Sequence, residues 1–175
     1  MTLKSRIVCL YIAILASLLF ILITPAVVYP AGYFSDLDGT VGVIDHQDFW
    51  NSLDPISKYI YQTGDLLCHQ QYERSIIIHE SQLPICIREF SILTGIILGF
   101  VLIRLRSKSI DNNIKRFFAI GLIAFSISFV EWLVKIIIDY EDSNGMVFAV
   151  SIVSGMGFAL MLNCIIEYVI ERTRN

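Results

Sequence analysis

The fold of this chain is decided by two neighbouring stretches, CHQQYERS (Cys68–Ser75) and LPICIREFSILTGIILG (Leu83–Gly99). Two cysteines, a histidine, two arginines and carboxylates are concentrated just before and just inside an apolar run that ends at Gly99. Polar groups in such a place are energetically costly and are rarely accidental. We therefore expect the rest of the chain to serve mainly to position these residues.

The composition is that of a small integral membrane protein. The chain has 175 residues, 55% of them hydrophobic, and a mean hydropathy of +0.67. These values are too apolar for an ordinary soluble domain, and the chain is too long for a single anchor. A net charge of -3 without a basic stripe gives no case for nucleic-acid binding.

Four apolar runs are long enough to cross a hydrocarbon core of about 30 Å as helices. The first is longer than the apolar region of a cleaved signal peptide, usually about 7–15 residues, so we favour an uncleaved helix that Pro25 kinks or ends. The predicted fold class is therefore all-α, a bundle of four transmembrane helices in one membrane domain, residues 1–175. The predicted spans are residues 7–28, 85–103, 117–138 and 146–166.

Residues 29–84 form the one substantial segment outside these spans, and they are mostly acidic. Asp54-Pro55 is typical of a helix N-terminus, which predicts an amphipathic helix from there to about Tyr72. One stripe of this predicted helix carries, at positions i, i+3, i+4 and i+7, Asp65, Cys68, His69 and Tyr72.

The basic residues predict how the chain is oriented. Nine of the thirteen Lys and Arg residues fall on one side of the predicted spans, which the positive-inside rule makes cytoplasmic. We expect a cell-membrane protein with both termini in the cytoplasm, and with segment 29–84 and the turn at 139–142 outside. The nine residues are Lys4, Arg6, Arg104, Arg106, Lys108, Lys115, Arg116, Arg172 and Arg174.

Charged residues near the outer ends of the predicted helices form a candidate polar cluster. Glu131 and Lys135 are four residues apart with the acid first, the favourable order for an ion pair within a helix. In one interpretation Lys135 extends to the membrane surface and Glu131 is neutral or paired with it. In the other, Glu131 and Lys135 belong to a cluster that also contains Gln70, Arg74, Arg88 and Glu89.

Cys68 and Cys86 have two competing interpretations. A disulfide between them is favoured, and it contributes about 3 kcal/mol in the chain-entropy model. The alternative is a metal site, because thiolate and imidazole ligands suit zinc or copper. Its candidate ligands are Cys68, His69, His79, Cys86 and Glu89.

Small residues at four-residue spacing predict close helix packing in the bilayer. They are Gly95 and Gly99 in the second span, and Ser151 and Gly155 in the fourth. Packing within one chain is favoured over contact with another subunit.

The two opening stretches carry a family resemblance. Cys-His-Gln at 68–70, Arg-Ser at 74–75 and Leu-Pro-x-Cys-x-Arg at 83–88 resemble the integral membrane family called domain of unknown function 2085. Many relatives have a second cysteine directly after the arginine, where this chain has Glu89. The resemblance implies a small multi-helix membrane protein and brings no established activity.

The sequence leaves two classes of function open. It contains no nucleophile elbow, phosphate loop or H-E-x-x-H motif. We therefore favour a non-catalytic accessory or structural subunit that packs against lipid and other membrane subunits, as in membrane metallo-oxidases or copper monooxygenases. The alternative is a membrane enzyme or a metal- or redox-handling protein with an outward-facing pocket, in which Arg74 and Arg88 hold an anionic group.

Overall fold

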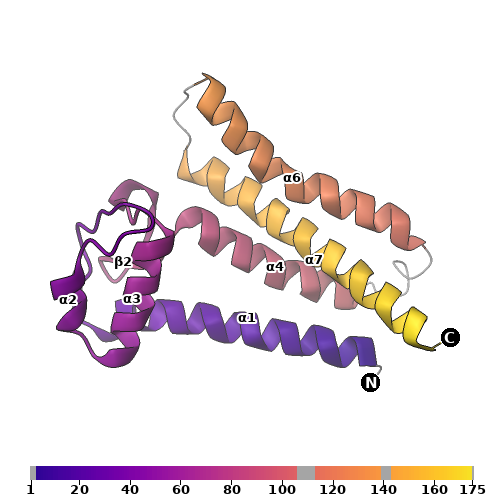
Figure 1. Ribbon diagram of the computed structural model, residues 1–175, viewed down its shortest axis with the longest axis horizontal. Helices are drawn as coiled ribbons and strands as arrows, with labels where there is room; N and C mark the ends of the chain where they lie inside the picture. Colours follow the sequence, from indigo (N-terminus) through magenta and orange to yellow (C-terminus); the bar gives the residue numbers. More distant parts are fainter. Residues whose placement is uncertain (1–2, 106–112, 139–142, 175) are drawn as a thin grey trace. The chain divides into compact units, whose positions relative to one another are not determined.

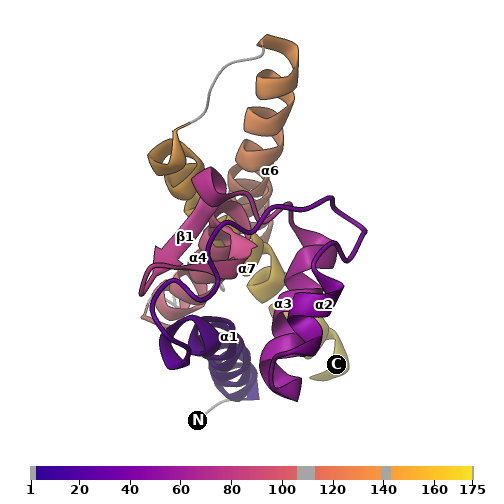
Figure 2. The same cartoon turned by 90° about the vertical axis from the view of Figure 1, so that its left-hand side faces the viewer.

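A computed structural model of the chain describes residues 3–105, 113–138 and 143–174 (Figures 1 and 2). Arg106, Lys108 and the predicted outer turn at 139–142 lie outside the described residues. The chain divides into two compact units, which we call the polar unit, Leu18–Phe90, and the helical unit, Met1–Ser17 with Ser91–Asn175.

Long helices account for the helical unit. Within the described residues, three helices are long and apolar enough to cross a membrane, namely α1, α6 and α7. The predicted span at 85–103 corresponds to α4, which carries Arg88 and Glu89 in its first turn and Arg104 in its last. Because α4 has only 19 residues, these three charges fall within almost any membrane-spanning stretch of it, whereas the longer α1, α6 and α7 contain spanning stretches with at most one charge. The bounds are Leu3–Val28 for α1, Ile87–Leu105 for α4, Ile114–Ile138 for α6 and Asn144–Arg174 for α7.

Glycines allow the helices of this unit to approach one another closely. A Cβ at Gly95 would clash with the carbonyl oxygen of Ile152, and one at Gly155 would clash with that of Ile92. The backbones of α4 and α7 therefore touch at this step. Helices α6 and α7, which lie side by side in Figure 1, meet in the same way, because a Cβ at Gly121 would lie 2.8 Å from the Gly157 carbonyl oxygen.

The polar unit contains a β-hairpin, so the all-α prediction is wrong in this part of the chain. Strands β1 and β2 pair in antiparallel register, with Ser75 opposite Cys86 and Ile78 opposite Ser81. Three successive β-branched isoleucines favour the first strand. His79 and Glu80 form the turn with φ of 51° and 59°, the backbone conformation that tight hairpins require. The unit's elements are α2 (Gln47–Asn51), α3 (Pro55–Leu67), η1 (Tyr72–Arg74), β1 (Ser75–Ile78) and β2 (Ser81–Cys86).

Helix α3 begins where the sequence predicts and ends earlier. The Asp54 carboxylate accepts hydrogen bonds from the amides of Ile56 and Ser57, at 3.0 and 3.2 Å, which confirms the N-cap. The bonds from Ser57, together with the Tyr29 hydroxyl, lower the pKa of Asp54 to about 2. The predicted extension to Tyr72 is wrong, because Cys68 is already extended, with φ -136° and ψ 149°.

The stripe predicted on that helix is consequently wrong as well. Of its four members only Asp65 lies in α3, since Cys68 and His69 follow the helix and Tyr72 begins η1. The physical reason is tertiary: after Leu67 the Gln70 side chain donates to the Pro84 carbonyl in β2, and the Gln70 carbonyl accepts from Gln82.

Aromatic rings form the core of the polar unit. Phe34, Trp50 and Tyr61 are fully buried, and the rings of Phe34 and Tyr61 stack with centroids 4.0 Å apart. The Tyr61 hydroxyl donates a 2.7 Å hydrogen bond to the Gln82 carbonyl in β2, and burial raises the pKa of Tyr61. This contact fixes α3 against the hairpin.

Candidate metal centre

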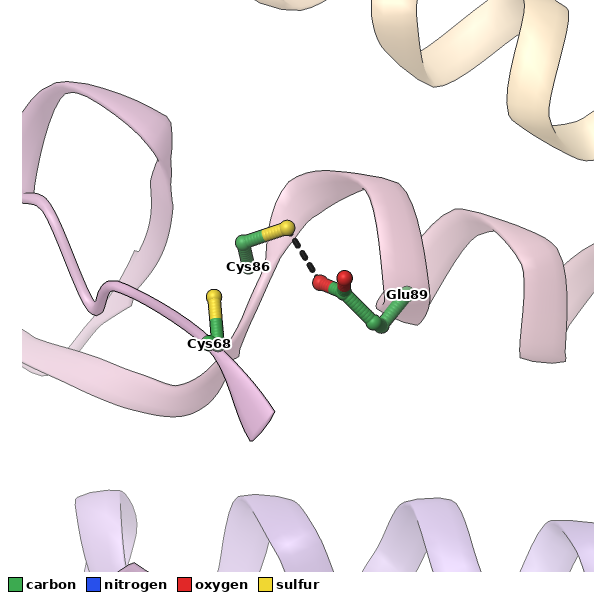
Figure 3. Close-up of side chains that lie close together, drawn as sticks. All are labelled: Cys68, Cys86 and Glu89. Carbon is green, nitrogen blue, oxygen red and sulfur yellow. Dashed lines mark hydrogen bonds between the residues drawn. The ribbon is translucent and has the colours of Figure 1, made fainter. Parts of the chain in front are cut away.

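Two thiols and a carboxylate converge in the polar unit. The Sγ atoms of Cys68 and Cys86 and a carboxylate oxygen of Glu89 all lie within 4.8 Å of one another. Figure 3 shows Glu89 reaching back along α4 toward Cys86, whose sulfur lies beside that of Cys68. Cys68 is buried, and the other two side chains are half-buried. Three potential metal ligands therefore meet at the junction of α3, β2 and α4.

A close backbone contact brings Cys68 to Cys86. A Cβ at Gly64 would collide with the carbonyl of Pro84, so only glycine lets β2 pass this near to α3. The buried side chain of Gln70 donates to the same Pro84 carbonyl at 3.3 Å and to the Tyr61 carbonyl at 3.4 Å. Cys68 is thus held next to the end of β2, and Glu89 follows Cys86 by three residues.

The side chain of Gln82 stabilises this junction through hydrogen bonds. Its amide nitrogen donates to the carbonyls of Gln70 and Leu37, at 2.7 and 3.2 Å, and its amide oxygen accepts from the Leu37 amide at 2.7 Å. Gln82 is completely buried. Sequence reasoning did not single it out, because a glutamine in an unrecognised strand carries no visible signal.

The electrostatics of the site make Cys68 the more acidic thiol. A hydrogen bond from Cys86 lowers the pKa of Cys68 from 9.0 to about 7, against the opposing effects of burial and of the Glu89 charge. The pKa of Cys86 is raised by the same hydrogen bond, by burial and by Glu89. The Cys86 thiol has a single proton, which it donates either to Cys68 or to the Glu89 carboxylate. The site therefore offers two thiols of different acidity next to the Glu89 side chain.

Both histidines among the candidate ligands lie outside the three-residue group. The exposed His69 has its Nδ1 3.1 Å from the Gly39 carbonyl oxygen. His79 is exposed in the hairpin turn. Within the described residues, the ligand group therefore consists of Cys68, Cys86 and Glu89.

The remaining predicted polar residues are distributed over both units. In the polar unit, Gln70 is buried, Arg74 is exposed in η1, and Arg88 is half-buried at the start of α4. Glu131 and Lys135 belong to α6 in the helical unit, and Glu131 is only 7% exposed. Together with Ser126 and apolar residues, it lines a hollow of about 650 Å³ formed by α6 and α7. A cluster that joins these residues stays a prediction.

The four predicted packing residues all lie in the helical unit. Ser151 is buried in α7. A Cβ at Gly99 would lie 2.7 Å from the side chain of Ala159, which continues the close contact of α4 and α7 made at Gly95 and Gly155.

Fold and site together define a mostly helical membrane protein with a compact polar unit that gathers two cysteines and a glutamate. The family of predicted membrane proteins called DUF2085, domain of unknown function 2085, matches residues 68–161, which is more than half of the chain. The chain belongs to this family, and the resemblance noted above is confirmed.

One relative extends the match beyond these residues. The uncharacterized protein MJ1492 of Methanocaldococcus jannaschii is 27% identical over 147 residues, which cover 83% of this chain and 85% of the relative. No solved structure matches the chain.

Proposed function

We propose that this protein binds a thiophilic metal ion, zinc foremost, through Cys68, Cys86 and Glu89. The observation that carries the proposal is the convergence of the three ligand atoms within 4.8 Å. Two sulfurs and one carboxylate oxygen suit Zn²⁺, whereas Cu⁺ favours an all-sulfur set. Three protein ligands leave the fourth tetrahedral position for water, a substrate or a partner's side chain.

The charge of the site favours a metal over a disulfide. Glu89 raises the pKa of both thiols, so its carboxylate disfavours the thiolate next to it. A bound divalent cation reverses this repulsion and makes all three groups favourable to one another. A disulfide between the same two cysteines would not use the Glu89 carboxylate beside them.

Metal analysis of the purified full-length chain tests the proposal. We expect about one zinc per chain, lost in Cys68→Ser and in Cys86→Ser. Cys164→Ser is the matched control, because Cys164 is also buried but lies in α7, outside the group. A chain without metal whose intact mass shows a Cys68–Cys86 disulfide would contradict the proposal and establish the disulfide instead.

The accessory-subunit function favoured by the sequence stays a prediction, and the same preparation tests it. Partner subunits in fixed stoichiometry after gentle purification would support it. A monomeric chain that carries its own zinc would contradict it.

We also propose that α4 is a fourth membrane crossing, which places both termini in the cytoplasm and the polar unit's residues 29–84 outside. Its 19 residues extend about 28 Å as a helix, close to the hydrocarbon thickness. Arg88 and Glu89 then lie at one membrane surface and Arg104 at the other. Topology reporters fused to the two ends should report the same side. Reporters on opposite sides would leave three crossings and exclude α4.

A further inference from the structure

The polar unit contains a buried carboxylate that the proposed zinc site does not use. Asp65 in α3 is 0% exposed. Its Oδ2 accepts from the indole nitrogen of Trp50 at 2.9 Å and from the His46 amide at 3.4 Å, both neutral donors. Its Oδ1 has no hydrogen-bond partner among the described residues. Burying a carboxylate is costly unless a positive charge compensates it.

The unpartnered oxygen points into the acidic loop that precedes α2. A Cβ at Gly39 would lie 2.9 Å from Asp65 Oδ1, 3.1 Å from Asp45 Oδ2 and 3.9 Å from the His69 carbonyl oxygen. Two carboxylate oxygens and one backbone carbonyl oxygen thus lie on the same side of Gly39, where a larger side chain would crowd Asp65 and Asp45. These oxygens come from two segments distant in sequence, the loop and the end of α3.

Hydrogen bonds hold the loop in this position. The Gly42 amide donates to the Leu66 carbonyl at 3.0 Å, and His69 Nδ1 lies 3.1 Å from the Gly39 carbonyl oxygen. Within the loop, the Thr40 amide donates to Asp45 Oδ2 at 2.5 Å. The oxygens are therefore oriented before any ligand arrives, which lowers the cost of binding.

We infer that Asp65, Asp45 and the His69 carbonyl bind a calcium ion. Carboxylate and backbone carbonyl oxygens are the ligands that Ca²⁺ prefers, whereas the cysteine site offers the softer sulfur. The ion supplies the positive charge that buried Asp65 lacks. With two carboxylates and water completing the shell, we expect a dissociation constant on the order of 10⁻⁴–10⁻³ M.

Terbium luminescence tests this site in the full-length chain in detergent. Tb³⁺ substitutes for Ca²⁺, and Trp50 lies beside the proposed site, so excitation of its indole should sensitise the ion. The chain has two tryptophans, so Trp132→Phe leaves Trp50 as the only indole, which can be excited at wavelengths beyond the tyrosine band. We expect sensitised emission that millimolar Ca²⁺ displaces.

Matched variants decide the outcome. Asp45→Asn should weaken Ca²⁺ binding at least tenfold, and Asp48→Asn, another exposed acid near the loop, should leave it unchanged. Asp65→Asn should abolish binding, and the exposed Asp45 keeps the test valid if that variant fails to fold. Equal affinities in Asp45→Asn and Asp48→Asn, or emission that Ca²⁺ does not displace, would overturn the inference. Cys68→Ser should leave the terbium signal intact, so this result is separable from the zinc measurement.

Discussion

The polar unit and the helical unit are each stabilised internally by a different kind of contact. In the helical unit, glycines bring backbones together, as at Gly95 and Gly155, and the packing depends on shape. In the polar unit, stacked rings form the core, and buried side-chain amides such as Gln82 need specific hydrogen-bond partners. A satisfied polar network permits few arrangements, so it fixes side chains in space. This difference explains why the candidate ligands gather in the polar unit.

The largest expected effect is on the shape-dependent packing of the helical unit. Gly155→Leu forces a side chain into the α4 backbone at Ile92, and we expect it to destabilise the chain by about 3 kcal/mol or more. Thermal unfolding in detergent measures this. Gly145→Leu is the control, because nothing lies within 4 Å of a Cβ there. Equal stability of the two variants would refute the proposed close packing.

Next comes the hydrogen-bond network of the polar unit. Gln82→Leu keeps much of the volume and strands the buried polar groups of Leu37 and Gln70, so we expect a loss of about 3 kcal/mol. Gln71→Leu, at an exposed glutamine, should stay within about 0.5 kcal/mol of the parent chain. Denaturant unfolding compares the two. A Gln82 variant as stable as the control would show that packing alone holds this unit.

A smaller effect is expected on the acidity of the site. In the metal-free protein, the Cys68 thiolate should form with a midpoint near pH 7, its pKa being about 7 rather than 9.0. Glu89→Gln removes a negative charge that opposes the thiolate, so the pKa of Cys68 should fall further. Thiolate absorbance against pH measures the midpoint. A midpoint that rises in the variant would contradict the assigned sign.

The smallest expected effect concerns the hairpin turn. Glu80 has φ of 59°, a conformation that is unfavourable for residues with a side chain. Glu80→Gly should therefore stabilise the protein by about 0.5–1 kcal/mol, measured by thermal unfolding. Glu80→Ala keeps the strain and should bring no such gain, so equal stabilisation by both would point to charge removal instead.

Sequence patterns predict the regular parts of this fold well. Long apolar runs indicate α1, α6 and α7, and the Asp54-Pro55 pair locates the start of α3, because both signals are local. The hairpin is missed because its turn, His79-Glu80, lacks the usual asparagine or glycine, and Pro84 is atypical of a strand.

The candidate site is likewise predictable only where local sequence signals identify its residues. Cys68, Cys86 and Glu89 are all among the residues that the sequence singles out, and the structure brings them together. His69 and His79 lie outside the three-residue group, because their positions depend on where α3 ends and on the hairpin turn. Gly64 and Gln82, which set the junction, act through tertiary contacts that no local pattern reveals.

X-ray absorption at the zinc edge of the purified protein tests the central claim most directly. The proposed site predicts two sulfur neighbours at about 2.3 Å and lighter oxygen neighbours at about 2.0 Å. Cys86→Ser should replace one sulfur by a lighter atom or release the ion. A zinc shell without sulfur, or a protein that holds no zinc and carries oxidised Cys68 and Cys86, would contradict the account.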